Sequence, residues 1–282
     1  MTWEERTAWL LSCLPQAAGY LAPDVQEIRV RSGQLTVLTG SRGAQIIPWE
    51  PTQEQVAQAA QALTGHSLHA RQEEAAQGSL VLRGGHRLGL SGQMGPGGFK
   101  TLSGFCLRVA GQWPGAADSF LKKVSIKPVS LMAIGPPGAG KTTFLRDLCR
   151  QWSLAGTQVA VNDQRGEMAA LYEGVPQLDV GPMTDVVAGC DKETGLFQIL
   201  RTLSPQVIFT DELDGHGDGE ALREALLCGV KVCASAHGAS LEDIRRRPGL
   251  RALMTEKYFD AYALLDKGHM AALYDREGRL WG

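Results

Sequence analysis

The chain has 282 residues, of which 44% are hydrophobic and 21% charged, with a formal net charge of −2. This length is enough for two domains with buried cores. The near-neutral charge and the aromatic content of 6% disfavour a nucleic-acid partner, because nucleic-acid surfaces are usually basic and carry stacking side chains. Apolar runs such as VSLMAIG are far shorter than the ~20 residues of a membrane span, so we expect a cytoplasmic protein without a transmembrane segment. Six cysteines without a CxxC pair favour reduced thiols over a disulfide framework or a zinc site.

The first part of the chain, residues 1–112, is predicted to be a small α+β domain. Its opening run MTWEERTAWLLS has a helical pattern, and the runs EIRVRSGQLTVLTG and GSLVLRGGHRLGLSGQM are typical of short strands separated by glycine turns. Between them, PTQEQVAQAAQALTG predicts a helix that closes at Gly65. Thr52 with Gln55 three residues later is the capping-box pattern that opens such a helix.

Residues 113–118 are predicted to be a linker, because the run VAGQWPGAADS concentrates glycine and proline. From residue 119 to residue 282 strands alternate with helices. The expected strands are VSLMAIG, TQVAVND, QVIFTDE and VKVCASAH, and the expected helices are KTTFLRDLCRQWSLAG and DGEALREALLCG. This alternation predicts an α/β domain with a mostly parallel sheet that binds ligands at the carboxyl ends of its strands.

The run GPPGAGKTT follows an apolar strand, opens a helix and satisfies the G-x-x-x-x-G-K-[ST] pattern of a P-loop. Glycines let backbone N–H groups wrap phosphates at the positive end of a helix, and the strand–loop–helix context makes a chance glycine loop a poor alternative. Lys141 is expected to reach the β- and γ-phosphates and Thr142 to ligate Mg²⁺, so ATP and Mg²⁺ are the expected cofactors. The predicted nucleotide-binding residues of the loop are Gly135, Pro136, Pro137, Gly138, Ala139, Gly140, Lys141, Thr142 and Thr143.

Two acidic clusters follow predicted strands. In VIFTDE, Asp211 would hold Mg²⁺ through water and Glu212 would lie near the attacking water, although an exposed acidic pair at the end of an edge strand is the alternative. In VNDQRGEMA, Asp163 and Glu167 would face the same phosphates if their strand is a neighbour in the sheet. In isolation, the second cluster is more typical of a solvated turn.

Cations and a histidine complete the candidate site. Arg87, Arg108, Arg165 and Arg201 are candidates to neutralise charge on the transferred phosphoryl group, with surface ion pairs as the alternative for each. VKVCASAHGAS places His237 at the end of a strand expected beside the VIFTDE strand, with a helix beginning near Ser240. A neutral imidazole there could hydrogen-bond the γ-phosphate or its water; a core histidine is the alternative.

Taken together, the runs EIRVR, GSLVLRGGHRLGLSGQ, IGPPGAGKTTFLRDL, DQRGEMA, DVVAGCDKETGL, ILRTLSPQVIFTDE and GVKVCASAHG resemble the stage III sporulation protein AA family, a branch of the secretion and type IV pilus ATPases. The most selective runs are GGHRLG, GCDKETG and ASAHG. The resemblance implies a RecA-like ATPase core, an N-terminal domain that packs on the neighbouring subunit, and a homo-oligomeric, hexameric ring. It also implies ATP hydrolysis on the mother-cell side of the channel between mother cell and forespore. There the protein would be peripheral to the membrane and bound to an inner-membrane component of a secretion-like complex.

The resemblance also implies roles at matched positions. The run from Asp163 to Glu167 is similar to the acidic box, in which Asp163 would contact the nucleotide. Asp211 and Glu212 match the Walker B pair, and His237 matches the histidine box.

Arg87 and Arg108 match positions from which the N-terminal domain could present arginines to a nucleotide across the subunit interface.

This sequence departs from the family pattern at two places. Gln164 stands where the family commonly has a glutamate, so either Glu167 or Glu212 must serve as the base. The run LDGHGD after Glu212 replaces a shorter isoleucine–glycine pattern. A nucleotide-gated assembly scaffold with little hydrolysis, and a RecA-like nucleic-acid motor, remain the alternatives to an ATP-driven motor.

Overall fold

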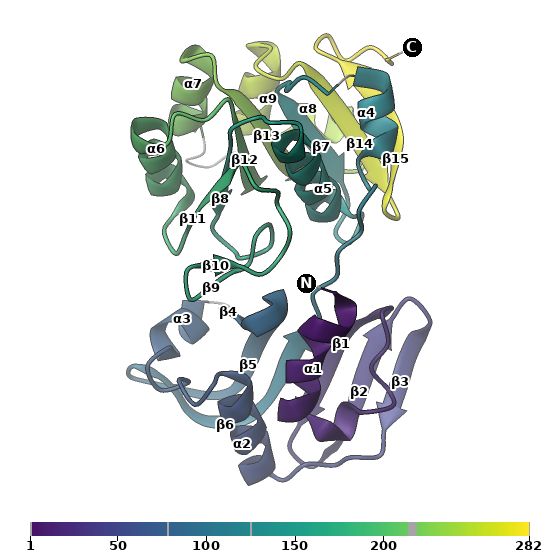
Figure 1. The fold of residues 1–282 in the computed structure, drawn as a ribbon, viewed down its shortest axis with the longest axis vertical. Helices are drawn as coiled ribbons and strands as arrows, with labels where there is room; N and C mark the ends of the chain where they lie inside the picture. The colour runs from purple at the N-terminus through teal and green to yellow at the C-terminus, as the bar shows by residue number, and fades with distance from the viewer. Residues whose placement is uncertain (1, 78, 125, 214–218, 282) are drawn as a thin grey trace. The chain divides into compact units, whose positions relative to one another are not determined.

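The computed structural model describes residues 2–77, 79–124, 126–213 and 219–281. These residues form two compact units, whose helices and strands are labelled in Figure 1. The N-terminal unit contains Met1–Gly111 together with Ala170–Leu178, and the P-loop unit contains Gln112–Ala169 and Asp179–Gly282. A short hairpin from the second half of the chain is therefore part of the N-terminal unit.

The N-terminal unit is built on a six-stranded antiparallel sheet in the order β3-β2-β1-β6-β5-β4. Its strands are β1 (Val25–Arg31), β2 (Gln34–Gly40), β3 (Gly43–Ile47), β4 (Leu80–Val81), β5 (Arg87–Gly95) and β6 (Gly98–Arg108), with β9 (Leu171–Tyr172) and β10 (Val175–Pro176) as the separate hairpin. Its helices are α1 (Trp3–Cys13), α2 (Gln53–Leu63) and α3 (Gln72–Gln77), with the 3₁₀ turns η1 (Pro15–Ala17) and η2 (Arg83–Gly85).

The capping box expected at Thr52 is confirmed. The Gln55 N–H donates to the Thr52 hydroxyl at 3.3 Å, and the Gln55 side-chain oxygen accepts from the Thr52 N–H at 2.9 Å. The last helical residue is Leu63 and Thr64 is the C-cap, so Gly65 closes the helix as expected, with a φ of 60° that a right-handed helix cannot contain.

The P-loop unit is built on a seven-stranded sheet in the order β11-β8-β12-β13-β7-β14-β15, in which β15 alone runs antiparallel to its neighbour. Its strands are β7 (Leu131–Gly135), β8 (Val159–Asp163), β11 (Thr184–Ala188), β12 (Val207–Glu212), β13 (Lys231–His237), β14 (Ala261–Asp266) and β15 (His269–Asp275). Its helices are α4 (Asp118–Val124), α5 (Lys141–Leu154), α6 (Lys192–Thr202), α7 (Gly219–Leu227), α8 (Leu241–Arg245) and α9 (Pro248–Thr255).

Both faces of this sheet are buried, which explains why its central strands are continuous apolar runs rather than alternating ones. In β7, Leu131 and Ala133 pack into one cluster with side chains of α4 and α5, such as Trp152. Met132 and Ile134 point to the other face and pack with α6, α7, α8 and α9. Within the described ranges, no helix is both long and apolar enough to cross a membrane.

The strand order brings the candidate residues to one edge of the sheet. Because parallel strands end at the same edge, the P-loop after β7, His237 at the end of β13, Glu212 at the end of β12 and Asp163 at the end of β8 follow one another in space. The sequence-based expectation that the strand ending in His237 lies beside the strand ending in Glu212 is confirmed.

Candidate active site

The P-loop is a backbone cradle in which two glycines are required for different reasons. Gly140 has a φ of 87°, and a Cβ added there would lie 2.9 Å from the Cα of Gly268. At Gly135 a Cβ would lie 2.7 Å from the carbonyl oxygen of Leu265. Gly138 faces open space, with no atom within 4 Å of an added Cβ. The cradle therefore fits polyphosphate: it is open at Gly138, and Gly140 has no side chain that could occupy the N-terminus of α5.

Lys141 begins α5 and is almost fully buried. Its ammonium group donates to the carbonyl oxygens of Gly135 at 2.9 Å and Pro136 at 3.0 Å, and lies 2.9 Å from Nδ1 of His237. Thr142 and Thr143 follow in the first turn of α5 and are partly exposed. A cation held at the mouth of an amide-lined loop is the arrangement that attracts phosphate oxygens.

His237 links this lysine to a carboxylate. Its Nε2 lies 2.9 Å from Oε2 of Glu212, and its Nδ1 faces the Lys141 ammonium. Because an ammonium only donates and a carboxylate only accepts, this bonding assigns the imidazole proton to Nε2 and leaves Nδ1 as the acceptor. The side chain is 33% exposed, so the alternative of a core histidine does not describe this position.

Three cationic or hydrogen-bond donor groups contact Glu212. Besides His237, the Arg165 guanidinium lies 3.1 Å from its carboxylate, and the Lys192 ammonium donates to its backbone carbonyl oxygen. The carboxylate is 18% exposed and so remains accessible to solvent. Of the two carboxylates expected at the end of β12, the structure describes the side chain of Glu212 but not that of Asp211, which lies outside the described side chains. Residues 214–218 of the LDGHGD run also lie outside the described residues.

Asp163 is fully buried and faces the backbone of its own loop. Its two oxygens accept from the N–H groups of Glu167, Met168 and Ala169 at 2.8, 2.9 and 2.9 Å. This placement favours a role for Asp163 in holding the acidic loop in position, rather than the nucleotide contact that the sequence led us to expect. Glu167, the other carboxylate of that loop, is partly exposed.

Two side chains that sequence analysis did not single out hold this site together. Arg146 on α5 donates to the carbonyl oxygens of Glu167 at 2.5 Å and Met168 at 2.8 Å, and so fixes the acidic loop against the P-loop helix. Lys192, which binds the carbonyl of Glu212, lies within GCDKETG, one of the most selective runs in the sequence. The selectivity of that run was the sequence feature that could have pointed to Lys192 as a site residue. For Arg146 the sequence offered only its place on the helix after the P-loop.

The remaining predicted arginines belong to other elements. Arg87 and Arg108 are cross-strand partners on β5 and β6 of the N-terminal unit, and Arg108 lies 3.5 Å from Glu27. Arg201 is in the last turn of α6 and stacks on Phe197, with 5.5 Å between the guanidinium carbon and the ring centroid. Arg165 is the candidate whose guanidinium contacts the cluster of Lys141, His237 and Glu212.

Comparison with known proteins identifies relatives of both units. The family profile described as "Sporulation stage III, protein AA" matches residues 15–280. Stage III sporulation protein AA of Bacillus subtilis (strain 168) is 33% identical over 272 residues, covering 91% of this chain and 89% of that protein.

Among solved structures, the Legionella pneumophila ATPase DotB has a TM-score of 0.58 at 13% identity, over 94% of this chain and 76% of that one. The pilus retraction motor PilT, solved with ADP, has a TM-score of 0.58 at 16% identity, over 90% of this chain and 77% of that one. At these identities the likenesses show the fold, which is the expected α/β P-loop core of the RecA-like secretion ATPases with a smaller N-terminal sheet region. With the family profile matching nearly its whole length, this chain belongs to the stage III sporulation protein AA family.

Proposed function

We propose that this protein is an Mg²⁺-dependent ATPase that works as a ring-forming, hexameric motor for a secretion-like complex of sporulation. The observation that carries the proposal is the continuous contact from Lys141 through His237 to Glu212, directly beside an open glycine cradle. A P-loop lysine, a hydrogen-bonded imidazole and a carboxylate are the groups that bind a triphosphate and activate water. The similarity to a stage III sporulation protein, to the ATPase DotB and to the pilus retraction motor PilT supports this assignment.

Binding of the nucleotide changes the partners of Lys141. Its ammonium now donates to two neutral carbonyl oxygens, and anionic phosphate oxygens are stronger acceptors. The Thr142 hydroxyl and, through water, Asp211 would hold Mg²⁺, which would supply positive charge to neutralise the phosphates. When Lys141 turns to the phosphates, Nδ1 of His237 loses its donor.

A free Nδ1 can accept a proton from water while Nε2–H stays bonded to the Glu212 carboxylate. Glu212 would then hold the imidazole in orientation and stabilise its charged form, the arrangement of a general base with an orienting carboxylate. In this assignment Glu212 and His237 act as one unit, and Arg165 binds the same carboxylate oxygen of Glu212 as His237 does. Glu167 is the alternative base.

The proposed ring uses the N-terminal unit. Arg87 and Arg108 are directly opposite each other in the β5–β6 pair, so both side chains emerge on one face of that sheet, and Glu27 pairs with Arg108 from β1 on the same face. We assign this face to the neighbouring subunit, where the arginines would approach its nucleotide. A membrane-bound component of the complex is the proposed partner of the assembled ring.

Phosphate release from ATP by the purified protein tests the proposal. Glu212→Gln should keep nucleotide binding and lose hydrolysis by about 100-fold or more, because Glu212 orients the His237 base and positioned general bases contribute on that order. If Glu212→Gln releases phosphate at the wild-type rate, the hydrolytic assignment fails. Wild-type protein that binds ATP and forms rings but releases no phosphate would be an assembly scaffold instead.

The subunit interface has its own test. Arg108→Ala protein mixed with Lys141→Ala protein should recover part of the activity, because some interfaces then pair an intact arginine with an intact P-loop. Absence of recovery at every mixing ratio would contradict an arginine acting across subunits.

A further inference from the structure

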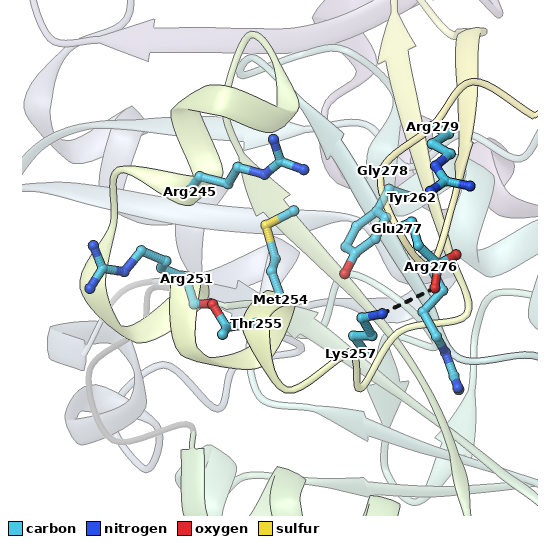
Figure 2. A pocket seen from close by; sticks show the side chains of 10 residues that line it. All are labelled: Arg245, Arg251, Met254, Thr255, Lys257, Tyr262, Arg276, Glu277, Gly278 and Arg279. Carbon is cyan, nitrogen blue, oxygen red and sulfur yellow. Dashed lines mark hydrogen bonds and ion pairs between the residues drawn. The ribbon is translucent and has the colours of Figure 1, made fainter.

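A cavity of about 550 Å³ lies in the P-loop unit, between helices α8 and α9 on one side and β14 with the turn after β15 on the other (Figure 2). Tyr262, near the start of β14, pairs with Met132 near the start of β7. The cavity is therefore at the amino-terminal edge of the parallel strands, whereas the P-loop follows their carboxyl ends. The cavity is distinct from the candidate active site.

The lining of this cavity is strongly cationic. Five of its side chains carry positive charge, against the single carboxylate of Glu277; the cations are Arg245, Arg251, Lys257, Arg276 and Arg279. Lys257 lies 3.2 Å from Glu277, and Arg276 lies 2.6 Å from Asp260, so two of the charges are balanced.

The other three cations are less well balanced. Arg245 lies 3.6 Å from the exposed Glu242, which is a weak, solvent-screened pair. In the part of the chain that the structure describes, Arg251 and Arg279 form no ion pair. An excess of unbalanced guanidinium groups around a concave site attracts anions.

The hydroxyl of Tyr262 lies buried at the floor of the cavity, without an acceptor among the described residues. Tyr262 is 1% exposed, and its hydroxyl has no hydrogen-bond partner among the described residues. Figure 2 shows this hydroxyl facing the space between Met254 and Lys257. Burial raises the pKa of Tyr262 to about 12, so the hydroxyl keeps its proton at neutral pH. A buried donor without an acceptor is costly, and an acceptor in the cavity removes that cost.

Gly278 makes room for one of the guanidinium groups. A Cβ added at Gly278 would lie 2.6 Å from Nη2 of Arg245, and the φ of Gly278 is 78°. The missing side chain lets the Arg245 guanidinium extend from the end of α8 to the turn after β15. The cavity thus has cations on both sides and a neutral donor on its floor.

We propose that this cavity binds a phosphate group, with Arg245, Arg279 and the Tyr262 hydroxyl as its donors. Guanidinium forks match the oxygens of a phosphate, and the volume is that of a small-molecule site. Two sources share this chemistry: a soluble phosphorylated molecule and the headgroup of an anionic phospholipid. The site does not depend on the proposed ATPase activity.

The first experiment measures binding of inorganic phosphate by calorimetry in the full chain carrying Lys141→Ala, which removes the main phosphate contact of the P-loop. Adding Arg245→Gln or Tyr262→Phe should weaken the remaining binding by about tenfold or more, since hydrogen bonds to charged groups are worth on that order. Arg42→Gln, which removes an exposed guanidinium of the N-terminal unit, is the matched control and should leave binding unchanged.

The second experiment distinguishes the lipid source. Vesicles of phosphatidylcholine with phosphatidylglycerol should sediment the protein more than pure phosphatidylcholine vesicles do, and Arg245→Gln with Arg279→Gln should abolish the difference while Arg42→Gln does not. Dependence on these residues in the phosphate assay alone assigns a soluble ligand, and dependence in the vesicle assay assigns a headgroup.

Thermal unfolding separates lost binding from lost folding. In phosphate-free buffer Tyr262→Phe should be at least as stable as its parent, because it removes an unpaired buried hydroxyl and keeps the ring. The proposal is overturned if neither assay responds to Arg245→Gln and Tyr262→Phe, or if Arg42→Gln has an equal effect.

Discussion

The ammonium nitrogen of Lys141 lies 2.9 Å from Nδ1 of His237, so the P-loop lysine and the histidine at the end of β13 are direct partners. Because a lysine ammonium has no acceptor, the contact leaves Nδ1 unprotonated and directs the imidazole proton to Glu212. Any ligand that draws Lys141 away changes the environment of His237. In the proposed ATPase, nucleotide binding and the hydrogen bonding of His237 would thereby be coupled through this one contact.

Asp163→Asn should loosen the acidic loop. The carboxylate accepts from three backbone N–H groups in a fully buried position, and an asparagine amide nitrogen would face one of those donors. We expect a loss of about 2–3 kcal/mol in the free energy of unfolding, measured by urea denaturation, since hydrogen bonds to buried charged groups are strong. Gln164→Ala, at an exposed neighbour, is the control. Equal stability of Asp163→Asn and Gln164→Ala would refute this role of Asp163.

Gly140→Ala should damage the P-loop more than a matched change elsewhere. Gly140 and Gly156 have φ angles of 87° and 88°, so alanine pays about 1–2 kcal/mol of backbone strain at either position. Only at Gly140 does the new Cβ meet another residue, Gly268, at 2.9 Å; at Gly156 it meets nothing within 4 Å. Urea denaturation and nucleotide binding should both show the larger loss for Gly140→Ala. A larger loss of stability for Gly156→Ala would contradict the close approach to Gly268.

His86 should make the stability of the protein depend on acid pH. It is fully buried, accepts from the N–H of Ala110 at Nδ1 and bonds the carbonyl of Arg6 through Nε2, and desolvation lowers its pKa to about 4. The unfolded chain takes up this proton near the ordinary pKa of 6.5, whereas the folded protein takes it up only near pH 4. The folded protein therefore keeps its full stability above pH 6.5 and loses stability as the pH falls toward 4. The shift corresponds to about 3 kcal/mol in total.

Urea denaturation of the full chain between pH 7 and pH 4, followed by tryptophan fluorescence, measures this dependence, because Trp9 stacks on His86. His86→Gln removes the titrating group and should flatten the pH dependence in this range while lowering stability at pH 7. An identical slope in wild type and His86→Gln would show that other groups cause the acid sensitivity.

Local sequence patterns predicted those parts of the fold that depend on neighbouring residues. The β7–P-loop–α5 unit and the helix start at Ser240 were predicted because apolar runs, glycines and capping residues act within a few positions. The β14–β15 hairpin was not predicted from the sequence. Its turn residues Lys267 and Gly268 have the positive φ angles of 46° and 83° that such hairpins require. A Lys-Gly pair indicates such a turn only weakly, because Asn-Gly and Asp-Gly are the pairs typical of it.

The candidate site was predictable in outline but not in its contacts. Parallel strands end at one edge, so residues after each strand could be expected there. The contact of Lys192 with the Glu212 carbonyl depends on how α6 packs beside β12, far away in the chain, and no local pattern encodes it. Likewise, the sequence indicates that Asp163 is a carboxylate of the site. Only the folded loop shows that backbone N–H groups bind both of its oxygens.

The most direct measurement is a double-mutant cycle on phosphate release under saturating ATP, using Glu212→Gln, His237→Ala and the pair together. If Glu212 and His237 act as one unit, each single change should lower turnover by about 100-fold or more with ATP binding retained, and the double change should cost little beyond the larger single effect. Unchanged turnover in His237→Ala, or effects that add independently in the double variant, would contradict the coupling of these two residues.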